Sequence, residues 1–306
     1  MSELSVTEVG GSGPYVVFLH GLFGQGKNFQ SIARGLEPDF RSLLVDLPNH
    51  GASPWTESVD YAAMADDVAA AVRSHLGTSG GGRVPADHGA PGIPADDGAP
   101  GIPADDGALP PAGDGTGPER GQARVHVVGH SMGGKVAMQL ALRHPELVDH
   151  LVVVDIAPAA GNGTGEFEHL LGALATLDLA RLESRSQADA ELTELIGSPT
   201  VRGFLLQNLQ RADGGWRWRA NLDLLRASLE VIGGFPDPAP GAGFDGPVLW
   251  VAGARSDYVR PEHGERMRAL FGRTRQLTVK DAGHWVHSEQ PEVFTQALRV
   301  FLASEG

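Results

Sequence analysis

The chain has 306 residues, and with 41% of them hydrophobic it can build a sizeable buried core. Its formal net charge of −14 argues against a nucleic-acid partner, because binding to phosphates depends on lysine and arginine. The absence of cysteine excludes disulfides, thiolate metal sites and a cysteine nucleophile.

Short apolar runs alternate with amphipathic stretches, which predicts an α/β fold with a mainly parallel sheet. The runs are apolar on both faces, as expected for strands covered by helices on two sides. They are Tyr15–His20, Ser42–Asp46, Val125–Gly129, Leu151–Asp155, Pro247–Val251 and Gln276–Val279. Helical patterns cover Tyr61–Leu76, Gly133–His144, Pro261–Phe271 and Pro291–Ala303. Leu4–Val9 is expected to add an antiparallel edge strand.

The first interruption of this rhythm covers residues 77–122. It contains Gly89–Asp97, which is repeated immediately as Gly98–Asp106. A repeat of glycine, proline and aspartate cannot offset its own ordering entropy, so we expect this segment to be disordered. Because lengthening a loop costs little, it is interpreted as a tolerated insertion at the surface.

The second interruption, residues 161–244, is mostly helical by pattern. Its candidate helices are Phe167–Leu179, Ala188–Ile196, Val201–Gln210 and Leu222–Ile232. It lies between two predicted strands, so we expect a helical cap over the edge of the sheet where open α/β sheets bind ligands. Residues 1–160 and 245–306 would then form the core.

The strongest chemical signal is the G-x-S-x-G pattern of Gly129–Gly133, which is centred on Ser131. It follows a predicted strand and opens a predicted helix, as in the nucleophile elbow of α/β-hydrolases. The glycines permit the sharp turn that exposes the serine oxygen. Ser131 is therefore the predicted nucleophile.

An oxyanion hole and a general base are expected beside this serine. In the α/β-hydrolase fold one oxyanion N–H comes from the residue after the nucleophile, and the other from the loop that begins here at His20. Met132 and Leu22 are the predicted backbone donors, whereas His20 is interpreted as structural. His284 is the predicted base, because Gly283 permits a tight loop near the C-terminus, and His287 is its competitor.

Several motifs together resemble one family. They are His20–Gly24, Asp46–Ser53, Gly129–Lys135, Asp155–Pro158 and Gly283–His287. They keep their order and are similar to the small serine esterases typified by the bacterial YbfF esterase and the related α/β-hydrolase domain-containing protein 11. The resemblance implies carboxylesterase or thioesterase activity on small acyl substrates, without a metal or organic cofactor.

The acid that orients the histidine is open between two aspartates. Most α/β-hydrolases place it after the penultimate strand, where Ser256 stands at the usual spacing and Asp257 comes one residue late. The resemblance implies instead the aspartate one strand earlier, Asp155. We favour Asp155 and keep Asp257 as the alternative.

The sequence thus predicts a serine hydrolase of carboxylic esters or thioesters. The same residues also fit C–C bond hydrolysis or perhydrolysis, or a hydrolase fold that binds a ligand without turnover. No spacing of His, Asp and Glu suggests a metal site. Residues 1–13 do not resemble a signal peptide, and no apolar run reaches the roughly 20 residues of a membrane span, so we expect a cytoplasmic protein with no membrane partner.

Overall fold

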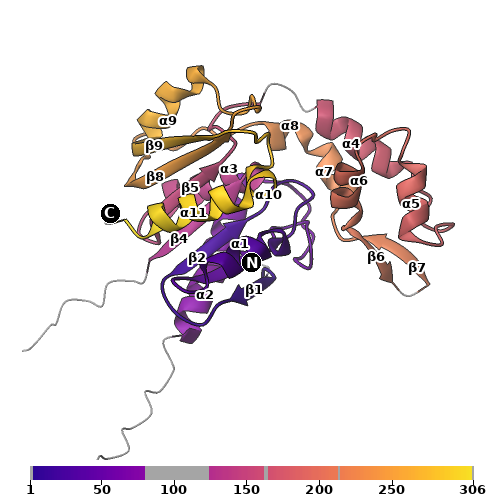
Figure 1. Ribbon diagram of the computed structural model, residues 1–306, viewed down its shortest axis with the longest axis horizontal. Helices are drawn as coiled ribbons and strands as arrows, with labels where there is room; N and C mark the ends of the chain where they lie inside the picture. Colours follow the sequence, from indigo (N-terminus) through magenta and orange to yellow (C-terminus); the bar gives the residue numbers. More distant parts are fainter. Residues whose placement is uncertain (1–2, 80–123, 162–164, 213, 305–306) are drawn as a thin grey trace, which may run out of the picture.

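The computed structural model describes residues 3–79, 124–161, 165–212 and 214–304 (Figure 1). Within these ranges one seven-stranded sheet has the order β1-β3-β2-β4-β5-β8-β9. Its strands are β1 (Val6–Val9), β2 (Tyr15–Leu19), β3 (Arg41–Val45), β4 (Val125–His130), β5 (Val148–Val154), β8 (Phe244–Gly253) and β9 (Phe271–Val279). β1 is antiparallel to β3, and every other pair is parallel. The predicted mainly parallel α/β sheet is confirmed.

Helices cover both faces of this sheet. They are α1 (Gln30–Leu36), α2 (Tyr61–Ser79), α3 (Met132–Arg143), α9 (Gly264–Leu270), α10 (Val286–Glu289) and α11 (Pro291–Leu302), with 3₁₀ turns at Gly26–Phe29 and Pro261–His263. Val16 and Phe18 of β2 pack with α1, α10 and α11 on one face. Val17 and Leu19 pack with α2, α3 and α9 on the other. Successive side chains of a strand point to opposite faces, so the all-apolar β2 is buried on both.

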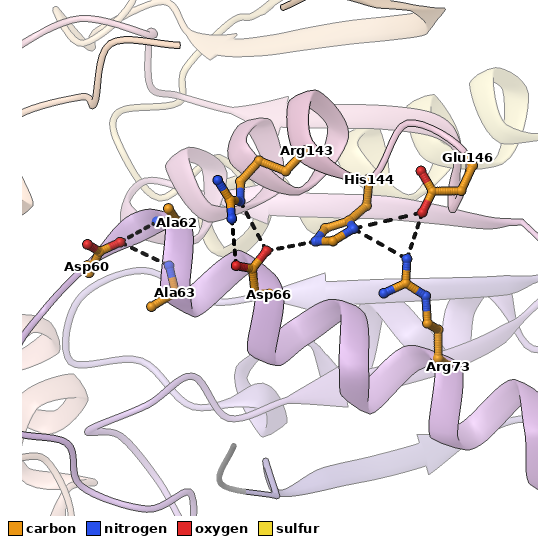
Figure 2. Close-up of polar contacts among 8 residues, drawn as sticks. All are labelled: Asp60, Ala62, Ala63, Asp66, Arg73, Arg143, His144 and Glu146. Carbon is orange, nitrogen blue, oxygen red and sulfur yellow. Dashed lines mark hydrogen bonds and ion pairs between the residues drawn. The ribbon is translucent and has the colours of Figure 1, made fainter. Parts of the chain in front are cut away.

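Charged side chains join α2 to the end of α3 (Figure 2). Arg143 donates two hydrogen bonds to the Asp66 carboxylate, at 3.0 and 2.6 Å. His144 Nε2 lies 2.8 Å from the same carboxylate. Arg73, about two helical turns further along the same face of α2, pairs with Glu146 at 2.6 Å. The network fixes α2 against the helix that follows Ser131.

The segment between β5 and β8 is mainly helical but also contains a hairpin. It consists of α4 (Gly165–Ala175), α5 (Arg185–Glu191), α6 (Pro199–Leu206), β6 (Leu209–Ala212), β7 (Gly215–Trp218), α7 (Leu222–Ala227) and α8 (Leu229–Gly233). β6 and β7 pair antiparallel. The elements from α4 to α7 lie together beyond one end of the sheet, at the right of Figure 1.

Several sequence-based boundaries in this segment are wrong. The helix expected over Val201–Gln210 ends at Leu206, because β6 begins at Leu209. The helix expected over Leu222–Ile232 is two helices, which meet at Ser228. Outside this segment, the helix expected to include Phe271 ends at Leu270, because Phe271 opens β9.

The repeat lies outside the described residues. Helix α2 continues to Ser79, so the first three residues of the segment expected to be disordered, residues 77–79, are helical. None of the helices in the described part of the chain is long and apolar enough to cross a membrane.

Candidate active site

Ser131 stands at the turn between β4 and α3. Its backbone φ is 53° and its ψ is −119°, a conformation that costs free energy for a residue with a side chain. Its N–H donates to the Val154 carbonyl at 3.0 Å, which holds the turn against β5. A Cβ at Gly133 would collide with the carbonyl oxygen of Leu19. Gly133, two residues after the serine, is therefore required because β2 approaches it closely.

His284 and Asp155 meet although they are far apart in the chain. Asp155 follows β5, is fully buried and has a positive φ of 51°. Its Oδ2 lies 2.8 Å from His284 Nδ1. Because a carboxylate only accepts, Nδ1–H is the donor and Nε2 is left with a lone pair. This arrangement is suited to a histidine that takes a proton from a serine.

Asp155 accepts two further hydrogen bonds, one of which the sequence did not suggest. The Gly253 N–H donates to Oδ1 at 3.0 Å, and the Ser256 hydroxyl donates to Oδ2. Ser256 stands where most α/β-hydrolases have the acid, and here it donates to Asp155, which follows the neighbouring strand. Its spacing from Gly253 was the signal that could have identified it.

The structure separates the two candidate acids. Asp155 contacts the His284 ring, whereas the side chain of Asp257 is 78% exposed and pairs with Arg260 at 3.1 Å. Both oxygens of Asp155 face donors from the protein interior. Of the two, only Asp155 has a described hydrogen bond to His284.

The His284 ring is also held by its neighbours. It stacks on Tyr258, with ring centroids 4.2 Å apart and an interplanar angle of 27°. His130 Nε2 lies 2.9 Å from the His284 carbonyl oxygen and donates to it. The residue before Ser131 thus holds the backbone of the histidine loop, a role that the sequence did not reveal.

The other histidines near Ser131 are buried and remain uncharged at neutral pH. Burial lowers the pKa of His20 to about 4 and the pKa of His287 to about 3, and it holds the pKa of His130 well below its usual value. His20 donates from Nδ1 to the Gly21 carbonyl at 2.8 Å and accepts the Leu47 N–H at 3.0 Å. Both of its nitrogens are engaged in holding the loop.

Leu22 and Met132 are both close to Ser131. Leu22 lies within a turn that is closed by a hydrogen bond from the Gly24 N–H to the Gly21 carbonyl, at 2.9 Å. Met132 is the first residue of α3, so its N–H has no acceptor within the helix. Both residues line a small cavity that also includes Ser131. The geometry leaves the Met132 N–H available for an anion at the start of the helix.

Lys135 links this region to the last helix before β8. Its ammonium donates to the Ile232, Gly233 and Gly234 carbonyls at 3.0, 2.7 and 2.7 Å. These carbonyls end α8, where a cation is favourable. Lys135 is therefore engaged in connecting α3 with α8.

Ser131 and His284 line the same cavity, and most of its other walls are apolar. The loop after β2 contributes Leu22 and Phe23. α4 and α6 contribute further apolar side chains to the lining, among them Phe167, Leu170, Phe204 and Leu205. An apolar cavity with a few polar groups is typical of a site for a small organic ligand.

Comparisons with known proteins agree with this geometry. Residues 16–297 match a model of the alpha/beta hydrolase family. The sn-1-specific diacylglycerol lipase ABHD11 of Mus musculus is 34% identical, over 95% of this chain and 81% of that protein. Esterase YbfF of Escherichia coli is 28% identical, over 94% of this chain and 92% of that protein.

Solved structures give the same result. A marine microorganism esterase superposes with a TM-score of 0.80 at 28% identity, over 98% of this chain and 100% of that one. With a matching family model over most of its length and the relatives above, the chain belongs to the alpha/beta hydrolase family, as an enzyme of the esterase and lipase type.

Proposed function

We propose that this enzyme hydrolyses carboxylic ester or thioester bonds of small acyl substrates through Ser131, His284 and Asp155. The observation that most supports this proposal is the 2.8 Å hydrogen bond between His284 and the buried Asp155, in a cavity that Ser131 also lines. In the proposed triad, Asp155 fixes the tautomer of His284 and stabilises its charged form.

The reaction has two steps. His284 Nε2 takes the proton of Ser131 Oγ, which attacks the carbonyl carbon of the substrate. The oxyanion that forms accepts from the Leu22 and Met132 N–H groups. The alcohol or thiol then leaves with the proton from His284, and an acyl-enzyme remains. A water molecule that gives a proton to His284 releases the carboxylic acid and restores Ser131.

Residues 161–244 form a cap over a hydrolase core of residues 1–160 and 245–306 in this proposal. The contribution of α4 and α6 to the cavity that Ser131 also lines supports this division. The apolar side chains of these helices favour an acyl chain over a charged group. The name of the mouse relative makes a diacylglycerol a natural further substrate to test.

We also propose that the enzyme acts in the cytoplasm on small molecules. A chain without cysteine has no need of an oxidising compartment, and the net charge of −14 disfavours nucleic acid.

A substrate panel tests the proposal. Hydrolysis of p-nitrophenyl esters from acetate to palmitate, of acyl-coenzyme A thioesters and of a diacylglycerol is measured for the wild type and Ser131→Ala. A matched control is Ser58→Ala, which changes an exposed serine. We expect Ser131→Ala to lose at least ~10⁴-fold in kcat and to lose labelling by a fluorophosphonate, while Ser58→Ala keeps both.

Two results would contradict the proposal. Full activity in a folded Ser131→Ala protein would remove Ser131 as the nucleophile. Fluorophosphonate labelling of Ser131 without turnover of any ester or thioester would instead point to another bond, such as a C–C bond.

A further inference from the structure

A second cluster of ligand-type side chains lies at the opposite end of the strands that carry Ser131 and Asp155. His126 is the second residue of β4, and Asp149 and His150 are the second and third residues of β5. Ser131 and Asp155 follow the other ends of these strands. Five residues of extended chain separate His126 from Ser131, or about 16 Å. The cluster is therefore distinct from the proposed catalytic site.

The three side chains converge on one carboxylate oxygen. Asp149 Oδ2 lies 3.0 Å from His150 Nδ1 and 3.6 Å from His126 Nδ1. One ligand atom from each of the three residues lies within 4.8 Å of the other two. In a tetrahedral site with bonds of ~2.1 Å, neighbouring ligand atoms are about 3.4 Å apart. Small side-chain movements would bring all three atoms to bonding distance of one ion.

Hydrogen bonding among these residues leaves a buried nitrogen unused. His126 and His150 are 4% and 2% exposed, so neither ring is open to bulk water. His150 Nδ1 donates to Asp149, but His126 Nδ1 is too distant to do so and has no hydrogen-bond partner among the residues that the structure describes. Leaving a buried polar atom without a partner costs free energy, and a metal ion would remove that cost.

We propose that His126, Asp149 and His150 bind a divalent transition-metal ion, for which Zn²⁺ is the best match. Two imidazoles and a carboxylate are ligands that Zn²⁺ takes in protein sites, with water completing the tetrahedron. Imidazole does not suit Mg²⁺ or Ca²⁺, which prefer oxygen.

The surroundings hold the ligands and leave a route from solvent. Phe40 packs edge-on against His126 at 5.7 Å, and Phe301 against His150 at 5.2 Å. The Asp149 side chain is 37% exposed, so an ion can enter past it. Arg124 lies 3.6 Å from the other carboxylate oxygen, Oδ1. The charge of Arg124 opposes the binding of a cation. Because Arg124 is near Oδ1, however, the other oxygen, Oδ2, is the one that faces the two imidazoles.

The bound ion would connect the starts of two adjacent strands. Because it binds the folded chain and not the unfolded one, it would raise the melting temperature. The sequence did not suggest this site, since His126 lies far along the chain from Asp149 and His150.

Direct metal titration tests the proposal. Purified protein without an affinity tag is titrated with Zn²⁺ in a calorimeter and with Co²⁺ by visible absorption, with Mg²⁺ as the ion expected not to bind. The variants are His126→Gln and Asp149→Asn. His126 is buried, so His126→Gln could fail to fold. Asp149→Asn changes a partly exposed residue and keeps its size, so the test does not depend on the His126 variant alone.

Two control variants locate the binding. Asp66→Asn alters another His–carboxylate pair, that with His144, and His284→Gln removes the histidine of the proposed catalytic site. We expect His126→Gln and Asp149→Asn each to weaken Zn²⁺ binding at least ~10-fold. Loss of a group that only hydrogen-bonds to a metal ligand already has an effect of this size, and these variants change the ligands themselves. We expect both controls to keep the wild-type affinity and the rise in melting temperature.

Two outcomes would overturn the proposal. One is unchanged Zn²⁺ affinity in folded His126→Gln and Asp149→Asn proteins. The other is loss of binding in His284→Gln alone, which would place the ion in the proposed catalytic site.

Discussion

At the residue scale, His284 is restrained from three directions. Asp155 accepts from its Nδ1, Tyr258 stacks on its ring, and His130 donates to its backbone carbonyl. The last contact comes from the residue before Ser131, so the Ser131 turn and the His284 loop are joined directly. A ring held on several sides loses little freedom when a substrate arrives, which favours fast proton transfer.

The assignment of Asp155 as the orienting acid leads to the first prediction. In Asp155→Asn an amide replaces a carboxylate that accepts from His284, Ser256 and Gly253. The amide NH₂ would then face a donor, and the His284 tautomer would no longer be fixed. We expect kcat to fall by ~10⁴-fold, as a change of the orienting acid does in serine hydrolases.

Steady-state kinetics on one p-nitrophenyl ester measures this effect, and Asp257→Asn is the matched control. The exposed carboxylate of Asp257 pairs with Arg260, so we expect Asp257→Asn to have a kcat near that of the wild type. A larger loss in Asp257→Asn than in Asp155→Asn would reverse the assignment.

Ser256 leads to a second prediction, because its hydroxyl reaches the carboxylate oxygen that binds His284. An aspartate at position 256 should bring a carboxylate close to the same ring nitrogen. We therefore expect the double variant Asp155→Asn/Ser256→Asp to regain at least ~10-fold in kcat over Asp155→Asn, which corresponds to about 1.4 kcal/mol.

The control is Asp155→Asn/Ser58→Asp, which adds a carboxylate at an exposed position. Equal kcat values in the two double variants would mean that position 256 cannot supply the acid to His284.

At the element scale, the helix that begins beside Ser131 is attached at both ends. Near its start Lys135 donates to the carbonyls that end α8, and near its end Arg143 pairs with Asp66 of α2. Movements of α8 or α2 would therefore reach α3. The second attachment depends on pH.

Asp66→Asn tests the attachment of α3 to α2. The hydrogen bond from Arg143, and then the one from His144, lowers the pKa of Asp66 below its usual value. A lowered carboxyl pKa stabilises the fold above the unfolded pKa of about 3.9, and the stabilisation disappears as the pH falls through the folded pKa. We expect Asp66→Asn to lower the free energy of unfolding at pH 7 by about 1 kcal/mol, since exposed ion pairs are screened.

Urea denaturation at several pH values measures this effect. The difference between wild type and Asp66→Asn should shrink once the pH falls below about 4. Asp237→Asn, which alters a far more exposed pair with Arg266, should change the free energy of unfolding less at every pH. A difference that does not depend on pH would show that the Asp66 charge is not its cause.

At the scale of the whole molecule, the sequence predicted what depends on neighbouring residues. Ser131 was identified by glycines within two positions, and the strands by continuous apolar runs. The Asp155–His284 contact joins residues from two different strand ends, so only the family resemblance suggested Asp155. His130 holds the His284 loop through side-chain geometry, which no local pattern encodes, whereas the spacing of Ser256 from Gly253 did mark its position.

The cap shows the same limit at the level of secondary structure. Trp216 and Trp218 alternate with arginines, a period of two that favours a strand, and β7 contains both. The preceding apolar residues of α6 continue with helical spacing to Leu209, so the start of β6 was hidden. The short α1 was missed because seven residues carry too little periodicity.

The cavity that Ser131 lines is lined by residues of the proposed core and of the proposed cap, which leads to the last prediction. Phe204 of α6 lines this cavity, and its ring lies 6.3 Å from that of Trp285 of the core. Phe204→Ala removes apolar wall and leaves room for further methylenes of an acyl chain. Each buried methylene contributes ~0.8 kcal/mol, or about a fourfold change in binding.

We therefore expect Phe204→Ala to shift the optimum of kcat/KM toward longer p-nitrophenyl esters. Room for two or more further methylenes should raise the ratio of kcat/KM for long over short chains by on the order of tenfold. Val231→Ala is the control, because this α8 residue is exposed and does not line the cavity. An equal loss at every chain length would mean that Phe204 only stabilises the cap. A changed optimum would place the acyl chain against α6, so that the 161–244 segment would select the substrate while the core performs the reaction.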